Sequence, residues 1–241
     1  MLFYLMNKTT IRIMNDYIDF TKNKPDGIYL WIDKQNIYQQ YALIMGPSNT
    51  PYFGGYFFFN IKFPCDYPDK PPEIKMLTIN NKIRFNPNLY NCGKVCLSIL
   101  GTWSGPNWKP IMNLRLVLTS IRSLMGEYPI QNEPGYENVK PEHLSSIEYN
   151  LYLIYYTYSI AIIDVLDDKY KDCSNYFKDE IKQEYEKNFN KIQEDLLSYQ
   201  QIHERVPIQK HVYFMEKEIL DFNFLVKKFN KISEKLKKKI N

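Results

Sequence analysis

The sequence is poor in the residues that build most metal sites and histidine-assisted nucleophiles. Its 241 residues include three histidines, none of them before His143, and four cysteines. Four cysteines in a chain of this length do not form a disulfide framework. The longest apolar run, 151–163, is shorter than the roughly 20 residues that a membrane-spanning helix needs. We therefore expect no membrane partner and a reducing compartment, the cytoplasm and possibly also the nucleus.

The chain also lacks a secretory signal and a basic body. Its first ten residues, MLFYLMNKTT, have no basic region followed by a cleavage site of small residues. Residues 201–241 hold 10 Lys/Arg against 5 Asp/Glu, so the other 200 residues carry a net charge of −1 out of a total of +4. A nearly neutral body gives no indication of nucleic-acid binding. We expect no nucleic-acid partner, and we expect a monomer.

What the first eighty residues do contain is one helical pattern and four strand patterns. Ile11, Met14 and Ile18 recur at helical spacing, which predicts an amphipathic helix over 9–23. Strand-like runs then cover 27–32, 38–45, 56–63 and 73–77. The connection between the second and third runs is rich in glycine and proline, which suits antiparallel neighbours. The pattern predicts a helix followed by a four-stranded antiparallel sheet.

The remainder is predicted to be helical apart from one irregular stretch. Residues 80–110 show no periodicity, and such a stretch inside a compact domain is typical of a functional loop. The clearest apolar stripe follows over 114–125 and predicts a helix. The whole order predicts an α+β fold, with a core domain over 1–168 and a helical extension over 169–241.

Beyond Pro141 every pattern predicts helix. Three apolar stripes begin at Ile147, Phe177 and Met215, and Val206-Pro207 reads as a break before the last of them. Its lysine-rich end, KKFNKISEKLKKKI, is typical of a solvated helix face, and the alternative is a docking surface for an acidic partner.

The irregular stretch contains NPNLYNCGKVCLSIL, with two cysteines, three asparagines and no histidine or acid. A structural zinc site needs a second pair of ligands, which Cys65 and the distant Cys173 do not form, so we expect no metal. A cysteine hydrolase needs a histidine to form the thiolate, and only a histidine from the tail could supply one. In the simplest reading Cys96 is a small buried hydrophobic residue.

A fourth interpretation is a cysteine that needs no base of its own. If the acyl group arrives as a thioester, exchange onto Cys96 requires only a small thiolate fraction near neutral pH. An asparagine amide could then stabilise the oxyanion formed when an amine attacks, and losing such a donor costs about 3–4 kcal/mol. The stretch, rich in asparagine and free of histidine, favours this chemistry, which requires an exposed sulfur beside an amide donor.

Two longer stretches carry a family resemblance. Residues 45–68, MGPSNTPYFGGYFFFNIKFPCDYP, and 84–110, RFNPNLYNCGKVCLSILGTWSGPNWKP, resemble the ubiquitin-conjugating enzymes. In that family a His-Pro-Asn motif precedes the thioester-forming cysteine by a fixed interval, and here Asn86-Pro87-Asn88 stands eight residues before Cys96. The similarity runs over about 9–168. It implies the ubiquitin-conjugating fold, with an N-terminal helix, a four-stranded antiparallel sheet, an irregular active-site segment and helices.

The resemblance implies a role for each matching residue. Cys96 would accept the C-terminus of the modifier as a thioester. Asn88 would orient the active-site loop and support the oxyanion, and Asn86 would brace the loop in place of the family's histidine. Asn132 or Glu133 would stand near the position where many members lower the pKa of the incoming lysine.

The resemblance also implies partners. They are ubiquitin or a ubiquitin-like modifier, an activating enzyme, a ubiquitin ligase and a substrate protein. No tightly bound cofactor is implied, because ATP is consumed upstream by the activating enzyme. The alternatives are a non-catalytic variant of the same fold that only binds ubiquitin or a ligase, which the presence of Cys96 and Asn88 disfavours, and the cysteine hydrolase.

Departures from the common pattern indicate a subgroup. Asn86, the long GTWSGPNW loop, the NEPGYE stretch (132–137) and the C-terminal extension resemble the Z-type conjugating enzymes. Asp69 occupies the place where many members have an aromatic residue for ligase docking, which predicts weak or altered ligase choice. Cys92 stands where the family often has Asn or Asp, and a regulatory disulfide between Cys92 and Cys96 is a hypothesis.

Overall fold

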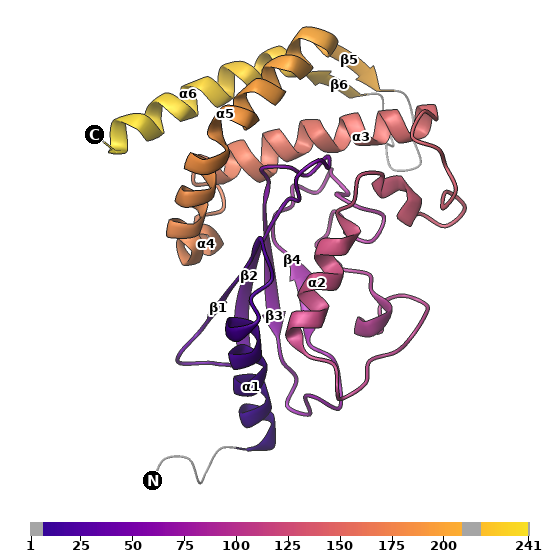
Figure 1. Cartoon of the computed structure of the whole chain (residues 1–241), viewed down its shortest axis with the longest axis vertical. Helices are drawn as coiled ribbons and strands as arrows, with labels where there is room; N and C mark the ends of the chain where they lie inside the picture. The colour runs from indigo at the N-terminus through magenta and orange to yellow at the C-terminus, as the bar shows by residue number, and fades with distance from the viewer. Residues whose placement is uncertain (1–6, 209–217, 241) are drawn as a thin grey trace.

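The computed structural model describes residues 7–208 and 218–240, and in these residues a four-stranded sheet is surrounded by helices (Figure 1). The main elements in chain order are α1 (Lys8–Lys22), β1 (Ile28–Ile32), β2 (Gln39–Met45), β3 (Tyr56–Lys62), β4 (Glu73–Met76), η2 (Ser98–Leu100), α2 (Leu114–Leu124), η3 (Pro129–Asn132), α3 (Leu144–Tyr156), η4 (Thr157–Asp164), α4 (Lys171–Ser174), η5 (Asn175–Phe177), α5 (Lys178–His203), β5 (Arg205–Ile208), β6 (Glu218–Asp221) and α6 (Phe222–Ile240). The predicted α+β fold is confirmed.

The helices α1 and α2 begin with the same capping chemistry. The side chain of Asn7 accepts a hydrogen bond from the Thr10 amide at 2.7 Å, and that of Asn113 accepts one from the Leu116 amide at 3.0 Å. Asparagine is favoured at this position because it satisfies an amide that has no partner inside the helix. The two helices contact each other, and their buried faces belong to the same hydrophobic cluster.

The sheet has strand order β1-β2-β3-β4 with every pair antiparallel. Because side chains alternate between faces, its two sides bury different residues. One side, the inner face, contributes Ala42, Ile44, Phe57, Phe59 and Ile61 to the large cluster that includes α1, α2 and α3. The opposite side, the outer face, contributes Leu43, Met45, Tyr56 and Phe58 to a second cluster. The sheet is therefore buried on both sides for part of its area.

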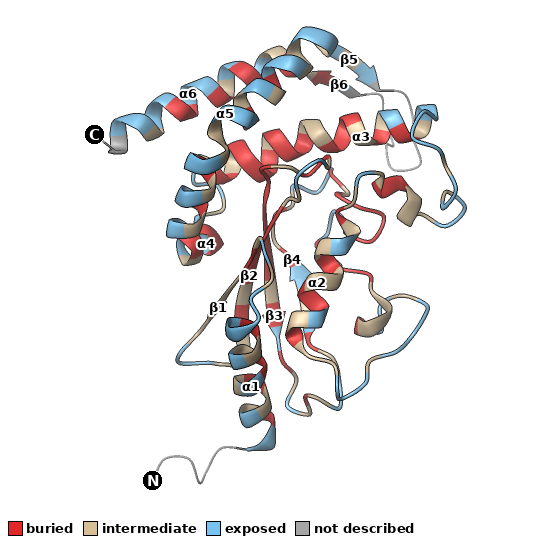
Figure 2. Ribbon diagram, viewed as in Figure 1, coloured by how far each residue is buried: buried red, intermediate tan, exposed pale blue. Residues whose placement is uncertain are grey.

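The C-terminal elements close the second cluster and extend the first. Phe177 stacks on Phe58, and Tyr176 stacks on Trp31 with ring centroids 4.0 Å apart. The helices α5 and α6 lie over α3, and their buried sides face it (Figure 2). At Gly54, whose φ is +78°, an added Cβ would lie 2.9 Å from Ile192 of α5. The described residues after 168 thus contribute to the same core, and the boundary at 168/169 stays a prediction.

The C-terminal part differs from the helical prediction in two places. The stripe from Ile147 begins as α3 and continues as a π-helix, η4. The predicted break at Val206-Pro207 is instead strand β5, which pairs with β6. The prediction of helix throughout is wrong here, because Pro207 is compatible with an edge strand and the pairing partner β6 begins only at Glu218. Met215 and His211 lie outside the described residues.

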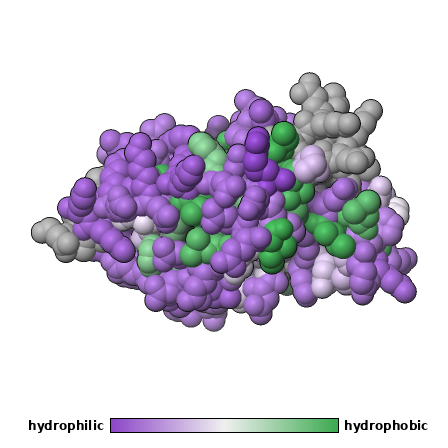
Figure 3. Space-filling model, turned by 90° about the horizontal axis from the view of Figure 1, so that it is seen from above, coloured by the Kyte–Doolittle hydropathy of each residue, from purple (hydrophilic) through white to green (hydrophobic). Residues whose placement is uncertain are grey.

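The outside of the helical layer is largely hydrophilic, with hydrophobic side chains gathered in a band across it (Figure 3). The exposed hydrophobic residues of α5, β6 and α6 include Ile202, Ile219 and Phe224. Among the described helices, none is long and apolar enough to cross a membrane.

Candidate active site

The stretch from 79 to 110 contains little regular structure, so its backbone groups need partners from elsewhere. Tyrosine hydroxyls supply several of them. The carbonyls of Ile79, Lys82, Arg84 and Phe85 accept hydrogen bonds from Tyr170 (2.7 Å), Tyr152 (3.5 Å), Tyr149 (3.1 Å) and Tyr52 (2.6 Å), respectively. Burial raises the pKa of Tyr52 and of Tyr170, which keeps both hydroxyls protonated as donors. The high tyrosine content of the chain is partly explained by these contacts.

Within this stretch the chain makes a narrow turn between Tyr90 and Lys94. The Tyr90 amide donates to the Lys94 carbonyl at 2.9 Å, and Leu89 pairs with Val95. Gly93 has φ +88° and lies close to the Met76 carbonyl, so only glycine fits without displacement. The turn therefore lies against strand β4, with the predicted site residues on its two arms.

Cys96 is completely buried. The predicted exposed sulfur is wrong for this conformation. Hydrogen bonds hold the backbone at and next to Cys96: the Asn88 carbonyl accepts from the Cys96 amide at 2.8 Å, and the Thr102 hydroxyl donates to the Val95 carbonyl at 2.7 Å. Cys96 nevertheless belongs to neither cluster of buried hydrophobic residues in the described part of the chain, whereas Cys173 belongs to the second.

Asn88 lies directly beside Cys96, as its spacing predicts. Its side-chain Nδ2 donates to the Cys96 carbonyl at 2.8 Å, and the residue is 6% exposed. Together with the bond from the Cys96 amide, this makes a reciprocal pair between the two residues. An amide donor therefore stands next to the cysteine without any imidazole.

Asn86 is fully buried and makes contacts in three directions. Its Nδ2 donates to the Leu124 carbonyl at 2.8 Å and to the Tyr52 hydroxyl at 3.2 Å, while its Oδ1 accepts from the Asn88 amide at 2.9 Å. Leu124 is the last residue of α2, so its carbonyl has no partner inside the helix. Asn86 therefore ties the end of α2 to the arm that holds Asn88.

Asn132 joins the same group of side chains. Its Nδ2 donates to the Leu124 carbonyl at 3.1 Å and lies 3.5 Å from the Asn86 Oδ1. Glu133 follows at the end of η3, where its amide donates to the Ile130 carbonyl at 2.9 Å, and its side chain is half-buried. The structure therefore brings Asn132, Asn86, Asn88 and Cys96 together through hydrogen bonds.

Sequence reasoning missed several residues that hold this site in place. Tyr52 contacts the stretch from outside through the Phe85 carbonyl. Thr102 and Trp108 belong to the stretch, where Thr102 donates to the Val95 carbonyl and Trp108 donates to the Pro68 carbonyl at 2.6 Å. Tyr52 lies in the TPY part of the 45–68 stretch, which is a usable signal. A polar side chain in the middle of a loop, such as Thr102, gives no comparable signal in the sequence.

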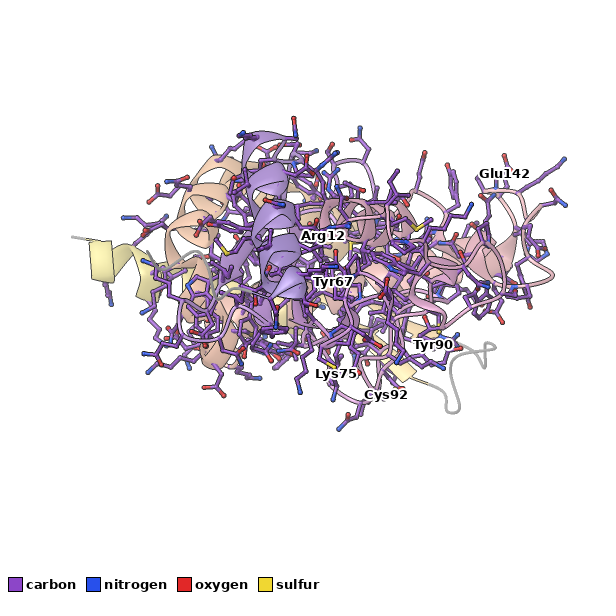
Figure 4. All side chains as sticks on the ribbon, turned by 90° about the horizontal axis from the view of Figure 1, so that it is seen from below. Arg12, Tyr67, Lys75, Tyr90, Cys92 and Glu142 are labelled. Carbon is purple, nitrogen blue, oxygen red and sulfur yellow. The ribbon has the colours of Figure 1, made fainter. Side chains whose placement is uncertain are left out.

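Arg12 and Tyr67, labelled in Figure 4, complete the surroundings on the side of α1. Both contact the buried carboxylate of Asp16, and the Leu114 amide at the start of α2 donates to it at 3.2 Å. Burial first, and then the Asp16 carboxylate, raise the pKa of Tyr67. This network joins α1, α2 and the loop before β4.

Neither described histidine serves the cysteine. The Nδ1 of His143 accepts from the Ser145 amide and caps α3, and the ring of His203 stacks on Tyr199. All four cysteines are free, with Cys65 and Cys92 exposed. In the part of the chain that the structure describes, no three His, Cys, Asp or Glu side chains gather into a metal site.

The family model described as ubiquitin-conjugating enzyme matches residues 12–148. The chain is 44% identical over 164 residues to ubiquitin-conjugating enzyme E2 Z of Xenopus tropicalis, which covers 68% of this chain and 52% of the relative. It is 44% identical over 160 residues to the protein of that name from Homo sapiens, covering 66% of this chain and 45% of the relative. The chain thus spans about half the length of these relatives.

Proposed function

The chain belongs to the ubiquitin-conjugating enzyme family, and we propose that it carries ubiquitin or a ubiquitin-like modifier as a thioester on Cys96. In the loading step, the Cys96 thiolate attacks the carbonyl carbon of the modifier's thioester on an activating enzyme. The new C–S bond forms, the old one breaks, and the cysteine of the activating enzyme leaves as a thiolate. ATP is consumed upstream by the activating enzyme, and no tightly bound cofactor is required.

In the transfer step, the amine of a lysine attacks the thioester on Cys96. An amide C–N bond forms, the C–S bond breaks, Cys96 leaves as a thiolate, and the proton released by the amine passes to solvent. Because a thiolate is a good leaving group, this exchange needs no histidine. The conjugating enzyme is then free to be loaded again.

The observation that carries the proposal is the reciprocal pair of hydrogen bonds between Asn88 and Cys96. It keeps an amide donor beside the residue on which the negative charge develops during transfer. A donor held in place before the reaction stabilises the oxyanion at no cost in reorganisation. Asn88 would exchange the Cys96 carbonyl for the thioester oxygen once the modifier is bound.

Loading also requires the loop to open, because Cys96 is buried. We place this movement in the stretch after Cys96, where Thr102 holds the loop and Gly101 and Gly105 have φ values of +67° and +133°. Glycines at such values change conformation at low steric cost. Contact with the activating enzyme would favour the open state.

Asn86 and Asn132 act as braces in this proposal. Both amides donate to the Leu124 carbonyl, which sets the position of the arm carrying Asn88. Glu133 is the acidic member of the pair at the predicted lysine-activating position, where its carboxylate would accept a hydrogen bond from the incoming lysine and orient it. Asp69 is exposed, and the altered ligase choice predicted from it belongs to the same proposal.

The further partners are a ubiquitin ligase and a substrate protein, and the protein is proposed to act as a monomer in the cytoplasm and nucleus. The alternative of a non-catalytic binding variant is favoured by one observation, the burial of Cys96. The cysteine hydrolase has no histidine at the site among the residues that the structure describes.

One assay separates the three functions. The chain is incubated with activating enzyme, ATP and ubiquitin, and is analysed on a gel with and without thiol. We expect a thiol-sensitive adduct that is lost in Cys96→Ala and kept in Cys92→Ala, the matched control four residues away. Absence of an adduct would support the binding variant, and cleavage of a ubiquitin amide would support the hydrolase. Asn88→Ala should load normally but transfer to lysine about 10²-fold more slowly.

A further inference from the structure

The outer face of the sheet is only partly covered by the C-terminal elements. Tyr170, Cys173 and Asp172 reach as far as Asn60 and Leu77. Beyond Asn60 a groove of 320 Å³ remains at the edge strand β4. It is lined by Asn60 and Lys62 of β3, Glu73, Ile74 and Lys75 of β4, and Cys92, Gly93 and Lys94 of the active-site turn. Strand register places Asn60 opposite Lys75, and Lys62 opposite Glu73, so these four side chains share one face.

The groove carries an excess of positive charge. Lys62, Lys75 and Lys94 come from three separate segments and stand against a single acid, Glu73. All three lysines are exposed, and within the described ranges none of them forms an ion pair. The surface therefore presents cations whose favourable partner would be a carboxylate from another molecule.

The positions of these cations are set by the backbone. The backbones of Lys75 and Lys94 form an isolated antiparallel β-bridge, and the Met76 amide donates to the Gly93 carbonyl at 2.8 Å. Figure 4 shows Lys75 beside Cys92 at the edge of the molecule. Because the turn is held against an edge strand, the spacing between the lysines is established before any ligand binds.

The groove also lies close to the proposed reacting sulfur. Lys94 precedes Cys96 by two residues, and in extended chain two residues span about 7 Å. Once the loop has opened as proposed, a polypeptide bound in the groove would therefore bring its neighbouring residues close to Cys96.

From this geometry we infer that the groove, here called the β4 groove, binds an acidic segment of the protein that receives the modifier. Two or three Asp or Glu residues next to the acceptor lysine would meet Lys62, Lys75 and Lys94. The inference rests on the proposed function and adds a substrate preference to it. Acceptor lysines with acidic neighbours would be modified faster than those with neutral ones.

The binding part is tested without any activating enzyme, so it does not depend on the conjugating activity. The probe is a twelve-residue peptide with one lysine among glutamates, and its control has glutamine in place of every glutamate. Alkylation of the exposed Cys92, which lines the groove, is followed by mass spectrometry, with the exposed Cys65 as an internal control. We expect the acidic peptide to slow alkylation of Cys92 severalfold, to leave Cys65 unchanged, and to lose this effect at high salt.

Charge reversal then identifies the lysines. Lys75→Glu and Lys62→Glu should each weaken the protection of Cys92 by about three- to fivefold, the upper range for exposed charge pairs. Lys34→Glu makes the same change in net charge outside the groove and should have no effect. The inference would be overturned if the acidic peptide did not slow alkylation of Cys92, or if it slowed alkylation of Cys92 and Cys65 equally. It would also be overturned if an oligonucleotide of the same charge slowed alkylation of Cys92 as much as the peptide does.

The substrate preference is measured on the loaded enzyme as a ratio. Transfer to the acidic peptide is divided by transfer to the glutamine peptide, so a change in loading cancels. We expect a ratio above one for the unaltered chain and near one for Lys75→Glu. Failure to load at all would refute the proposed function but not the binding measured by alkylation, and a ratio of one in the unaltered chain would refute the preference.

Discussion

The sheet and the active-site stretch meet along strand β4, but they are held together by different interactions. In the sheet, backbone groups pair with each other along the strands, and residues from both faces fill hydrophobic clusters. In the stretch from 79 to 110, several carbonyls are paired by tyrosine hydroxyls from elsewhere in the chain and by the side-chain amide of Asn88 within the stretch. The sheet is therefore stabilised by many backbone hydrogen bonds and apolar contacts, and the stretch by a few hydrogen bonds from particular side chains.

This difference separates stability from function. Removal of one buried ring from the sheet is felt by the whole fold, whereas removal of one hydroxyl or amide loosens only the stretch that it contacts. Local opening of this kind has a lower free energy than global unfolding. The opening over Cys96 proposed above would be easier for a stretch held in this weaker way.

The largest effect is expected from the sheet itself. Phe59 is fully buried on the inner face, and Phe59→Ala should lower the free energy of unfolding by about 3–5 kcal/mol, because it removes a large apolar side chain and leaves a cavity. Denaturant unfolding measures this change. A loss below about 1 kcal/mol would show that the sheet is not the main source of stability.

The second effect concerns the brace of the active-site stretch. Asn86→Ala removes the hydrogen bonds from Asn86 to the Leu124 carbonyl and to the Tyr52 hydroxyl, and it leaves the Asn88 amide without its acceptor. We expect a loss of about 1–3 kcal/mol in unfolding free energy. Lysine transfer should slow more strongly than loading, because the position of Asn88 is lost.

A matched variant sharpens this result. Asn86→His keeps a donor and an acceptor at the same place and should recover part of the transfer rate. If Asn86→Ala changed loading and transfer equally, the residue would be needed for folding only.

How well the sequence predicts each region follows from the same difference. The strands and α1 lie within one or two residues of their predicted limits, since their apolar periodicity is local. The spacing of Asn88 and Cys96 predicts their proximity. The sequence does not predict the burial of Cys96, nor the hydrogen bond from the Thr102 hydroxyl to the Val95 carbonyl beside it. Nor does the sequence predict that C-terminal residues pack on the outer face of the sheet. Tyr176 stacks on Trp31, which lies 145 residues earlier in the chain, and local periodicity gives no information on a contact between such distant residues.

A smaller effect is expected at the contact between the C-terminal part and the active-site stretch. Tyr170→Phe removes the hydrogen bond to the Ile79 carbonyl and should cost about 1 kcal/mol. Amide hydrogen exchange should increase near residues 79–85 and stay unchanged in β2 and β3. Tyr17→Phe on α1 is the matched control. Equal increases in the stretch and the sheet would show that the two regions open together.

The smallest effect is expected from an ion pair outside both regions. Asp19 of α1 accepts a hydrogen bond from the Arg115 Nε at 2.8 Å, and this bond is the main cause of its lowered pKa. A carboxylate with a lowered pKa in the folded state stabilises the fold above its ordinary pKa of about 4, and this contribution is lost as the pH falls through the lowered value.

Arg115→Gln should therefore reduce the free energy of unfolding at pH 7 by less than about 0.5 kcal/mol, because the pair is partly exposed, and this reduction should become smaller as the pH is lowered from 7 to 2. Denaturant unfolding at the two pH values, with hydrogen exchange near 79–85 as a second measurement, checks both expectations. A reduction of the same size at pH 2 would mean that Arg115 acts through packing. Faster amide hydrogen exchange of the active-site stretch in Arg115→Gln would mean that the α1–α2 contact supports this stretch as well. The sheet and the stretch would then be less independent than their local hydrogen bonds indicate.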